Sequence, residues 1–325
     1  MIHAIKKAAK HIALGGANLS QQCTLGLPDP QTEISVWLRG LGDPLDVTNN
    51  HVLACAAPFT VGIGLDAYSD RGKSPRSLSL EFRERNGERR LLADVGLRNS
   101  ETVNSASQAL SLFHVRSCRN WCLPRPRLWA YDLYQFIRRR EDKNPEIYVS
   151  ALASRAMTAC FICPRPVVLV SVRHEERTNI FPMNLFGSIG DGHFAFALNS
   201  VRKAAPLVER AGRVAISTIP FRFAELARQL GKNHLKESVN CANLPFETTS
   251  SNALGLPIPQ FALRVREMEI EAVRNLGSHT LFFARVLLDE RRGDDLQFCM
   301  IHGIYEARRR RIHTPPMQPL WKSAS

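Results

Sequence analysis

The stretch from residue 177 to residue 203, RTNIFPMNLFGSIGDGHFAFALNSVRK, concentrates residue types that could bind a polar ligand. Thr178 and Asn179 stand where a strand is expected to pass into a turn. The residues after them are small or carry amides, so we expect a loop whose backbone and side-chain amides face a ligand. The loop residues in question are Pro182, Met183, Asn184, Gly187 and Ser188.

The end of the same stretch combines a hydroxyl group with two cations. Asn199, Ser200, Arg202 and Lys203 follow an expected strand and directly precede an expected helix. Free backbone N–H groups at a helix start and cationic side chains both favour an anion, so the pattern indicates a phosphate or carboxylate pocket. On the residues alone, a plain helix cap explains Ser-x-Arg-Lys as well.

The elements that must position these residues are mostly strands. Two helices are expected between the strands, at 203–212 and 221–232, and each is closed by a glycine at its C-terminus. The expected strands are VVLVSV at 167–172, HFAFALN at 193–199, VAISTIP at 214–220, FALRVREMEIEAV at 261–273, HTLFFARVLLDE at 279–290 and FCMIHGIY at 298–305.

Six antiparallel strands with short helices between them predict a mainly β fold, a Greek-key β-barrel with short helices. In EMEIEAV the alternation places Met268, Ile270 and Ala272 inward and three glutamates outward. A doubly wound nucleotide fold is excluded because regular strand–helix alternation is missing.

The first part of the chain predicts a β-rich accessory domain over residues 1–145. ISVWLRG alternates apolar and polar residues, and LSLEFRE and RLLADVGL are expected to pair through the Asn86-Gly87 turn. A helix over 128–142 would link this domain to the second one, residues 146–325, which ends in a basic tail. Thr48-Asn49 faintly resembles Thr178-Asn179, so a diverged second barrel and an unrelated accessory domain both stay open.

Composition limits the classes of function. The chain has 325 residues, a net charge of +13 and no apolar run of the length that a membrane helix needs. The arginine runs at 138–140 and 308–311 lack interleaved aromatic residues, so nucleic acid is an unlikely partner and solvated helix ends are favoured. The basic opening segment lacks the apolar core of a secretory signal. We therefore expect a cytoplasmic protein, with an organelle presequence as the alternative.

Cysteine and histidine positions do not predict a metal site. Cys160 and Cys163 fall in an expected strand, where residues three apart point to opposite faces, and Cys118 and Cys122 have no histidine nearby at finger spacing. Free thiols, buried or partly buried, are the preferred interpretation.

The 177–203 motif resembles the signature of the flavin reductase family, which has an FMN-binding split barrel. That signature has the form Asn-x-x-Thr/Pro-x-Ser-Ser-Phe-x-Ser, a strand, and Asn-Arg-Ser-Ser-Arg-Thr before a helix. AGRVAISTIP, the Leu226-Ala227 pair and Gly277-Ser278-His279-Thr280-Leu281-Phe282 resemble later blocks of the family, so the resemblance covers about residues 157–308. The matching positions of the signature are Asn179, Pro182, Asn184, Leu185, Phe186 and Ser188, then Asn199, Ser200, Arg202 and Lys203.

The resemblance implies noncovalently bound FMN, less often FAD, at a barrel surface, and usually a homodimer. By carry-over, Pro182 and Met183 would contact the ring edge, and Asn184 and Ser188 would lie near the ribityl chain. Ser200, Arg202 and Lys203 would hold the phosphate. His279 would lie beside the ring as a tentative catalytic residue, although a histidine at the start of an apolar strand is more often structural.

The implied function is an FMN-binding oxidoreductase that passes hydride from NAD(P)H to free flavin or to another small molecule. An oxidase or monooxygenase component is the alternative within enzymes. The chain departs from the signature at Asn184 and Leu185, where the family has paired serines, at Gly187 and at 191–193. A flavin-binding or flavin-free storage or interaction protein that has lost catalysis is therefore the alternative outside enzymes.

Overall fold

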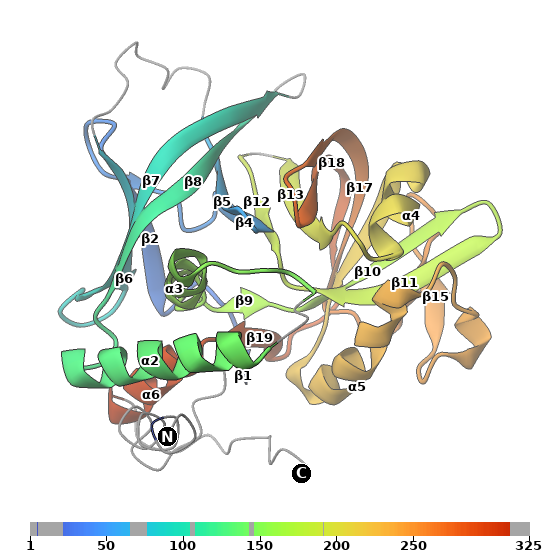
Figure 1. The fold of residues 1–325 in the computed structure, drawn as a ribbon. Coiled ribbons are helices and arrows are strands. Elements are labelled where there is room, and N and C mark those ends of the chain that lie inside the picture. Colours follow the sequence, from blue (N-terminus) through green and yellow to red (C-terminus); the bar gives the residue numbers. More distant parts are fainter. Residues whose placement is uncertain are drawn as a thin grey trace.

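The computed structural model describes residue 5 and residues 22–65, 77–104, 108–142, 146–190 and 192–312. The opening segment apart from Ile5, and the tail after Ile312, lie outside the described residues. The fold is mainly β, as predicted, and consists of two curled sheets with short helices around them (Figure 1).

The sheet of the N-terminal half has seven antiparallel strands in the order β3-β2-β6-β7-β8-β5-β4. Its interior is aliphatic and aromatic, with Val36, Leu80 and Phe82 fully buried. The predicted β6–β7 pair forms around Gly87, which has a positive φ of 67°. The strands are β2 (Ile34–Arg39), β3 (Leu45–Asp46), β4 (His51–Ala56), β5 (Phe59–Gly64), β6 (Leu78–Glu84), β7 (Leu91–Asn104) and β8 (Ala109–Asn120).

The sheet of the C-terminal half also has seven antiparallel strands, in the order β11-β10-β14-β17-β18-β13-β12. Phe181, Phe196 and Phe282 fill its core. The strands are β10 (Val168–His174), β11 (Arg177–Met183), β12 (Phe186–Ser188), β13 (His193–Asn199), β14 (Arg213–Thr218), β17 (Arg264–Asn275) and β18 (His279–Arg291).

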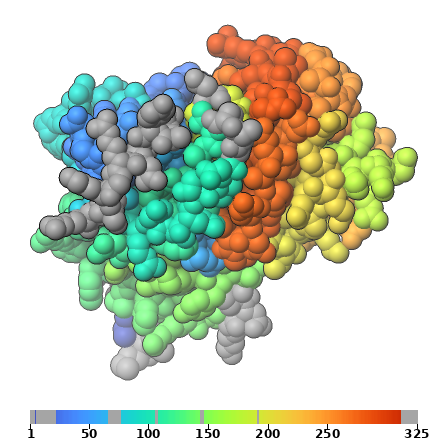
Figure 2. All heavy atoms as spheres, turned by 90° about the horizontal axis from the view of Figure 1, so that it is seen from above, coloured from blue at the N-terminus to red at the C-terminus, as the bar shows by residue number. Residues whose placement is uncertain are grey.

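The two sheets have the same topology. Numbering the strands of each sheet from one to seven in chain order gives 2-1-5-6-7-4-3 in both cases. The halves lie side by side (Figure 2), and β4 packs against β12, β13 and β18. In both directions, the turn after the third strand of one sheet contacts the turn after the sixth strand of the other sheet. The turn after β4 contacts the turn after β17, where Ser278 N donates to Ala57 O at 3.0 Å, and Gly190 after β12 lies against Gln108 after β7.

A third sheet ties the two ends of the chain together. It has the order β1-β19-β9, with β1 (Cys23–Leu27), β9 (Arg165–Pro166) and β19 (Gln297–Ile301). A two-stranded sheet, β15 (Thr248–Ser250) and β16 (Pro257–Pro259), completes the strands of the described residues.

Helices cover the sheets and connect them. The predicted linking helix is α2 (Arg125–Glu141), and α3 (Ala151–Cys160) and α6 (Gly303–Ile312) pack with it against the N-terminal sheet. The C-terminal half carries α4 (Ala204–Ala211), α5 (Ala224–Gln229) and the 3₁₀ helices η2 (Phe221–Phe223), η3 (Leu230–Leu235) and η4 (Cys241–Asn243). No helix within the described part of the chain is long and apolar enough to span a membrane.

Several local predictions are wrong. The expected ligand loop after Asn179 is largely strand, since β11 continues to Met183 and β12 begins at Phe186. The last expected strand stops at Ile301, and helix α6 follows. Gly212 closes α4 in the left-handed conformation as predicted, whereas Gly231 lies inside η3 and caps no helix.

The predicted outward position of Glu267 is wrong. Its carboxylate is fully buried and accepts hydrogen bonds from the backbone N–H groups of Ala253 and Leu254. A register shift between Glu267 and Met268 interrupts the strict alternation, so both residues are buried.

Cys160 and Cys163 are also placed differently from the prediction. Cys160 ends α3 and Cys163 follows that helix, so neither lies on a strand. Both are buried free cysteines, and Cys118 and Cys122 are free as well, which agrees with the predicted thiols.

Candidate functional site

A cleft of about 670 Å³ lies at the edge of the C-terminal sheet. Its walls come from the ends of β11 and β13, the start of β18, the segment α5–η3, and strands β1 and β19. Residues far apart in the sequence therefore share one surface. The lining residues that carry polar or cationic groups are Gln22, Thr24, Asn184, Asn199, Arg202, Arg228, His234 and His279.

The structure brings together six of the residues that were predicted to contact the ligand or to act in catalysis, and the signature position Leu185 lies with them. β11 ends at the cleft and β13 ends beside it, so their terminal residues face the same space although more than a dozen residues separate them. The six are Pro182, Met183, Asn184, Asn199, Arg202 and His279.

Residues outside the 177–203 motif contact the cleft wall at the end of β11. His234 Nε2 donates to the Pro182 carbonyl at 2.7 Å, and Asn184 Nδ2 lies 3.6 Å from Met300 Sδ. Burial is the main cause that lowers the pKa of His234, so its ring is neutral at neutral pH. The Pro182 carbonyl is consequently satisfied by the protein itself.

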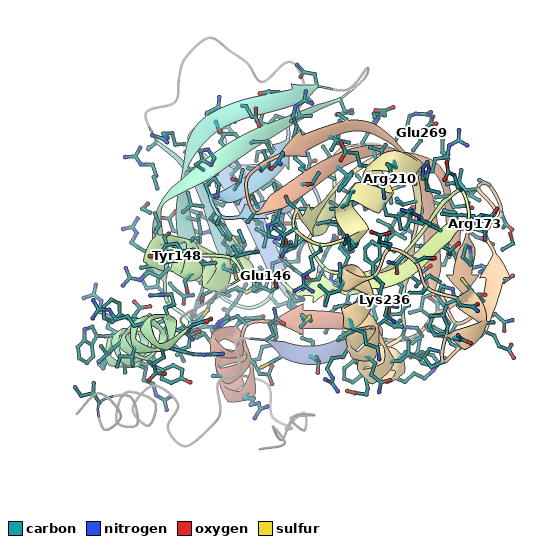
Figure 3. The ribbon with its side chains drawn as sticks, turned by 45° about the vertical axis from the view of Figure 1, so that its right-hand side comes forward. Glu146, Tyr148, Arg173, Arg210, Lys236 and Glu269 are labelled. Carbon is teal, nitrogen blue, oxygen red and sulfur yellow. The ribbon has the colours of Figure 1, made fainter. Side chains whose placement is uncertain are left out.

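Arg202 is paired with a carboxylate from the segment that links the two halves. Its Nε donates to Glu146 Oε1 at 2.7 Å and its Nη2 donates to the other carboxylate oxygen, while Asn199 Nδ2 donates to Glu146 at 3.0 Å. The hydrogen bond from Arg202 lowers the pKa of Glu146 and holds it ionised. Figure 3 shows Glu146 between the two halves of the molecule. A carboxylate of the protein thus already pairs with Arg202, one of the two arginines that line this cleft.

Ser200 and Lys203 do not line the cleft. Ser200 Oγ bonds to Gly277 O at 3.3 Å and to Thr280 Oγ1 at 3.2 Å, and Lys203 Nζ pairs with Glu237 at 3.1 Å. Of the predicted anion pocket at the start of α4, Asn199 and Arg202 face this space.

Asn179, Phe186 and Ser188 are also placed elsewhere. Asn179 is fully buried, and its Nδ2 donates to the carbonyls of Asn233 at 3.0 Å and Lys236 at 2.8 Å, so it fastens η3 to β11. Phe186 and Ser188 line a second cleft on the other side of β12.

Comparison with known proteins gives one family. Residues 160–302 match the model of the flavin reductase like domain. The matched segment, which is less than half of the chain, is similar to that domain and is named the flavin reductase-like domain after it. A search of curated protein sequences found no match.

Solved structures resemble this domain at low overall scores. An FMN-binding protein from Thermus thermophilus is 28% identical, with a TM-score of 0.36, 39% of this chain and 71% of that chain covered. An NADH:FAD oxidoreductase of Streptomyces globisporus is 16% identical, with a TM-score of 0.41 and 46% and 88% covered. The styrene monooxygenase flavin reductase of Pseudomonas putida is 22% identical, with a TM-score of 0.38 and 45% and 92% covered. These likenesses add nothing beyond the family match.

His279 of the flavin reductase-like domain is a neutral ring that reaches the cleft from the start of β18. Ser278 Oγ lies 2.8 Å from its Nδ1, and the same hydroxyl accepts a hydrogen bond from Ala57 N at 2.9 Å. Ala56 N also donates to Nδ1 at 3.4 Å, so Nδ1 is the acceptor, the Ser278 hydroxyl donates to it, and the ring proton is on Nε2. Burial lowers the pKa of His279 to about 4. The ring is then an uncharged hydrogen-bond donor at neutral pH.

Most of the cleft residues that lie outside the 177–203 motif were not predicted from the sequence. Arg228 and His234 belong to the α5–η3 segment, Phe298 and Met300 to β19, and Glu146 to the linking segment. None of them stands near the motif in sequence, and a lone arginine or histidine in a helix carries no local signal. The described residues contain no group of three or more His, Cys, Asp or Glu side chains that could hold a metal ion.

Proposed function

We propose that the flavin reductase-like domain binds FMN in the cleft of Pro182, Arg202 and His279, with FAD as the less favoured flavin. We further propose that the protein is an oxidoreductase that passes hydride from NAD(P)H to free flavin or to a small acceptor. The observation that carries the proposal is the convergence of six motif residues on one cleft within the family-matched segment.

The residues of the cleft fit a phosphorylated planar ring. The volume of about 670 Å³ lies in the range of roughly 300–1,000 Å³ that small-molecule sites occupy. An apolar wall suits a ring system, and the guanidinium groups of Arg202 and Arg228 suit a phosphate. The apolar wall consists of Val167, Met183, Leu185, Ala197, Leu198, Phe298 and Met300.

The residues of this chain have separate tasks in the proposal. A bound flavin supplies the hydride and electron chemistry. Arg202 and Arg228 neutralise the phosphate, and each must exchange a carboxylate for it, Arg202 that of Glu146 and Arg228 that of Glu225. His279 offers its Nε2–H to a polar ring edge, and His234 keeps the end of β11 in place through the Pro182 carbonyl. The apolar wall excludes water from the face of the ring.

The alternative is a protein that stores flavin, or a flavin-free interaction module, without catalysis. Two observations favour it as a second candidate. Arg202 is already neutralised by Glu146, and the paired serines of the family signature are Asn184 and Leu185 in this chain.

Titration with FMN and with FAD, followed by quenching of flavin fluorescence, tests binding. Catalysis is then tested with NADH and with NADPH as donor and free FMN as acceptor. The oxidation of the donor is followed by the loss of the absorbance of the reduced nicotinamide at about 340 nm. Saturable FMN binding with oxidation of either donor supports the reductase. Binding without donor oxidation supports the storage protein, and no flavin binding overturns the flavin assignment.

The organisation of the whole chain belongs to the same proposal. We propose a cytoplasmic protein in which residues 1–145 form a diverged second barrel and residues 146–325 form the catalytic domain. The identical strand order of the two sheets supports duplication. In this proposal the N-terminal half takes the position of a second subunit, and one chain replaces the homodimer that the family resemblance implies.

A further inference from the structure

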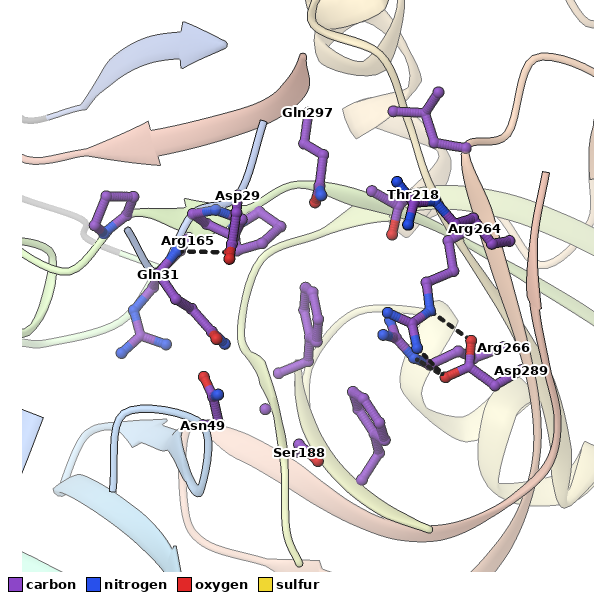
Figure 4. A pocket seen from close by; sticks show the side chains of 18 of the residues that line it. Asp29, Gln31, Asn49, Arg165, Ser188, Thr218, Arg264, Arg266, Asp289 and Gln297 are labelled. Carbon is purple, nitrogen blue, oxygen red and sulfur yellow. Dashed lines mark hydrogen bonds and ion pairs between the residues drawn. The ribbon is translucent and has the colours of Figure 1, made fainter. Parts of the chain in front are cut away.

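A second cleft, of about 750 Å³, lies between the two halves and is separate from the proposed flavin site. The N-terminal half contributes one wall with Gln31, Asn49 and His51, to which Arg165 of β9 is added. The other wall comes from β17 and β18, with Arg264, Arg266 and Asp289 (Figure 4). Phe186 and Phe194 line the space as well, with ring centroids 6.5 Å apart.

Arg165 is a buried cation that pairs with no carboxylate in the part of the chain that the structure describes. Only 5% of it is exposed, and its Nε has no hydrogen-bond partner among the described residues. No carboxylate of the described residues forms an ion pair with it; its one polar contact there runs from Nη2 to His51 Nε2 at 3.4 Å. An unpaired buried charge is costly, so such a group is retained where something else compensates it.

The groups in contact with Arg165 supply no negative charge, and Asp29, whose carboxylate lines the same cleft, forms no ion pair with it (Figure 4). His51 Nδ1 donates to the Val47 carbonyl at 2.7 Å, which leaves Nε2 as a neutral acceptor for Arg165. Burial, followed by the charge of Arg165, lowers the pKa of His51 to about 4. Burial raises the pKa of Cys160 to about 12 and raises that of Cys163 as well, so both remain neutral thiols.

The other arginines of the cleft each have a carboxylate partner within the protein. Arg264 and Arg266 share the Asp289 carboxylate, with Nε–oxygen distances of 2.6 and 3.0 Å, and Arg291 pairs with Asp294. Because two guanidinium groups share one carboxylate, positive charge is left over at that wall as well, but Arg165 is the arginine of the cleft that pairs with no carboxylate of the described residues.

We propose that this second cleft binds an organic oxyanion, a carboxylate or a phosphate ester, whose charged group pairs with Arg165 and whose apolar part lies on Phe186 and Phe194. A guanidinium matches two oxygens of either group at once. The side-chain amides of Gln31 and Asn49 lie on the same wall as Arg165 (Figure 4), and neither makes a hydrogen bond to another described side chain, so both are available to the ligand.

Calorimetric titration of the full chain with benzoate, phenyl phosphate and benzamide tests the proposal. We expect that benzoate, phenyl phosphate or both bind. We expect no binding of benzamide, which has the same aromatic ring but no negative charge. Comparing benzoate with phenyl phosphate shows whether the carboxylate or the phosphate is the preferred group. Arg165→Met lowers the affinity for the bound anion by roughly tenfold or more. Arg291→Met, which removes an exposed cation of the same cleft, changes it by less than about twofold.

A second readout separates a ligand-binding arginine from a structural one. If Arg165 is kept for a ligand, Arg165→Met leaves the thermal midpoint of the ligand-free protein unchanged or raises it, because a buried unpaired charge is removed. If Arg165→Met does not fold, Arg165→Lys is titrated instead and also binds the anion more weakly, because it loses the two-pronged geometry.

The proposal is overturned if neither anion binds the wild-type protein, if benzamide binds as tightly as benzoate, or if the Arg165 variants retain full affinity. FMN affinity serves as the independent control, since Arg165 does not line the proposed flavin cleft. An Arg165→Met protein that still binds FMN and has lost benzoate or phenyl phosphate separates the two sites.

Discussion

At the scale of single residues, Arg202 decides whether the proposed flavin site can hold a phosphate. We predict that Arg202→Ala weakens FMN binding by roughly 10- to 100-fold, the loss expected for a charged hydrogen bond. The affinity is measured by quenching of flavin fluorescence. Lys203→Ala is the matched control, because its ammonium pairs with Glu237 outside the cleft. Equal losses in the two variants would show that Arg202 contributes only its general positive charge.

Three buried histidines make stability depend on pH. Burial lowers the pKa values of His51, His279 and His302 to about 4, below the ordinary value of 6.5. Because the unfolded chain takes up these protons first, the neutral rings stabilise the fold fully above pH 6.5. The stabilisation is lost as the pH falls from 6.5 towards 4, at most about 3 kcal/mol per histidine.

His302 offers the clearest test of this dependence. Its Nδ1 accepts a hydrogen bond from Ile304 N at 3.1 Å, so its proton is on Nε2, 3.0 Å from the Tyr131 hydroxyl. We predict that the free energy of unfolding in urea falls between pH 6.5 and pH 4, and falls less steeply for His302→Gln. Identical pH slopes for the two proteins would contradict the prediction.

At the scale of elements, the close approach of β12 to β4 depends on a glycine. A Cβ atom at Gly187 would lie 2.2 Å from the carbonyl oxygen of His51, which is part of the β4 backbone and cannot rotate away. We predict that Gly187→Ala lowers the free energy of unfolding by about 1–3 kcal/mol. Gly231→Ala is the control, because its Cβ would meet no atom within 4 Å. Urea unfolding compares the two, and an unchanged Gly187→Ala protein would refute the contact.

Glu146 of the linking segment pairs with Arg202, which lines the proposed flavin site. Glu146 and a flavin phosphate cannot both take the Arg202 guanidinium in the same geometry. We predict that Glu146→Gln tightens FMN binding roughly two- to fivefold, the scale of a partly exposed ion pair. Glu237→Gln is the matched control and changes FMN affinity little. Weaker binding by Glu146→Gln would mean that Glu146 positions Arg202 for the ligand.

At the scale of the whole molecule, two sheets of the same topology within one chain bear on the oligomeric state. β4, β12 and the turns at Ala57 and Gly190 already form an interface between the halves. We predict that light scattering coupled to size-exclusion chromatography gives the mass of one chain. The mass of two chains would favour the homodimer that the family resemblance implies.

The amino-acid sequence was sufficient for the strands and helices with clear periodicity. β10, β13, β14, β18 and α4 form where the patterns predict them, because each has a continuous apolar face to bury. Prediction failed at 177–188, where prolines, amides and glycines suggest a loop. These residues form strands because β11 pairs with β10 and β12 pairs with β13, the neighbouring strands along the chain, and this backbone pairing outweighs the local preference for a loop.

What the sequence by itself determined is the mainly β fold, which follows from the local alternation of apolar residues. The family resemblance added candidate site residues, of which Pro182, Asn199, Arg202 and His279 line one cleft whereas Ser200 and Lys203 do not. Only the tertiary structure decided which side of a strand each residue faces and which partner it meets. A bulge buries Glu267, Glu146 reaches Arg202 from the linking segment, and Arg165 is buried without a carboxylate partner among the described residues. These outcomes depend on contacts between segments far apart in sequence, for which a local pattern carries no information.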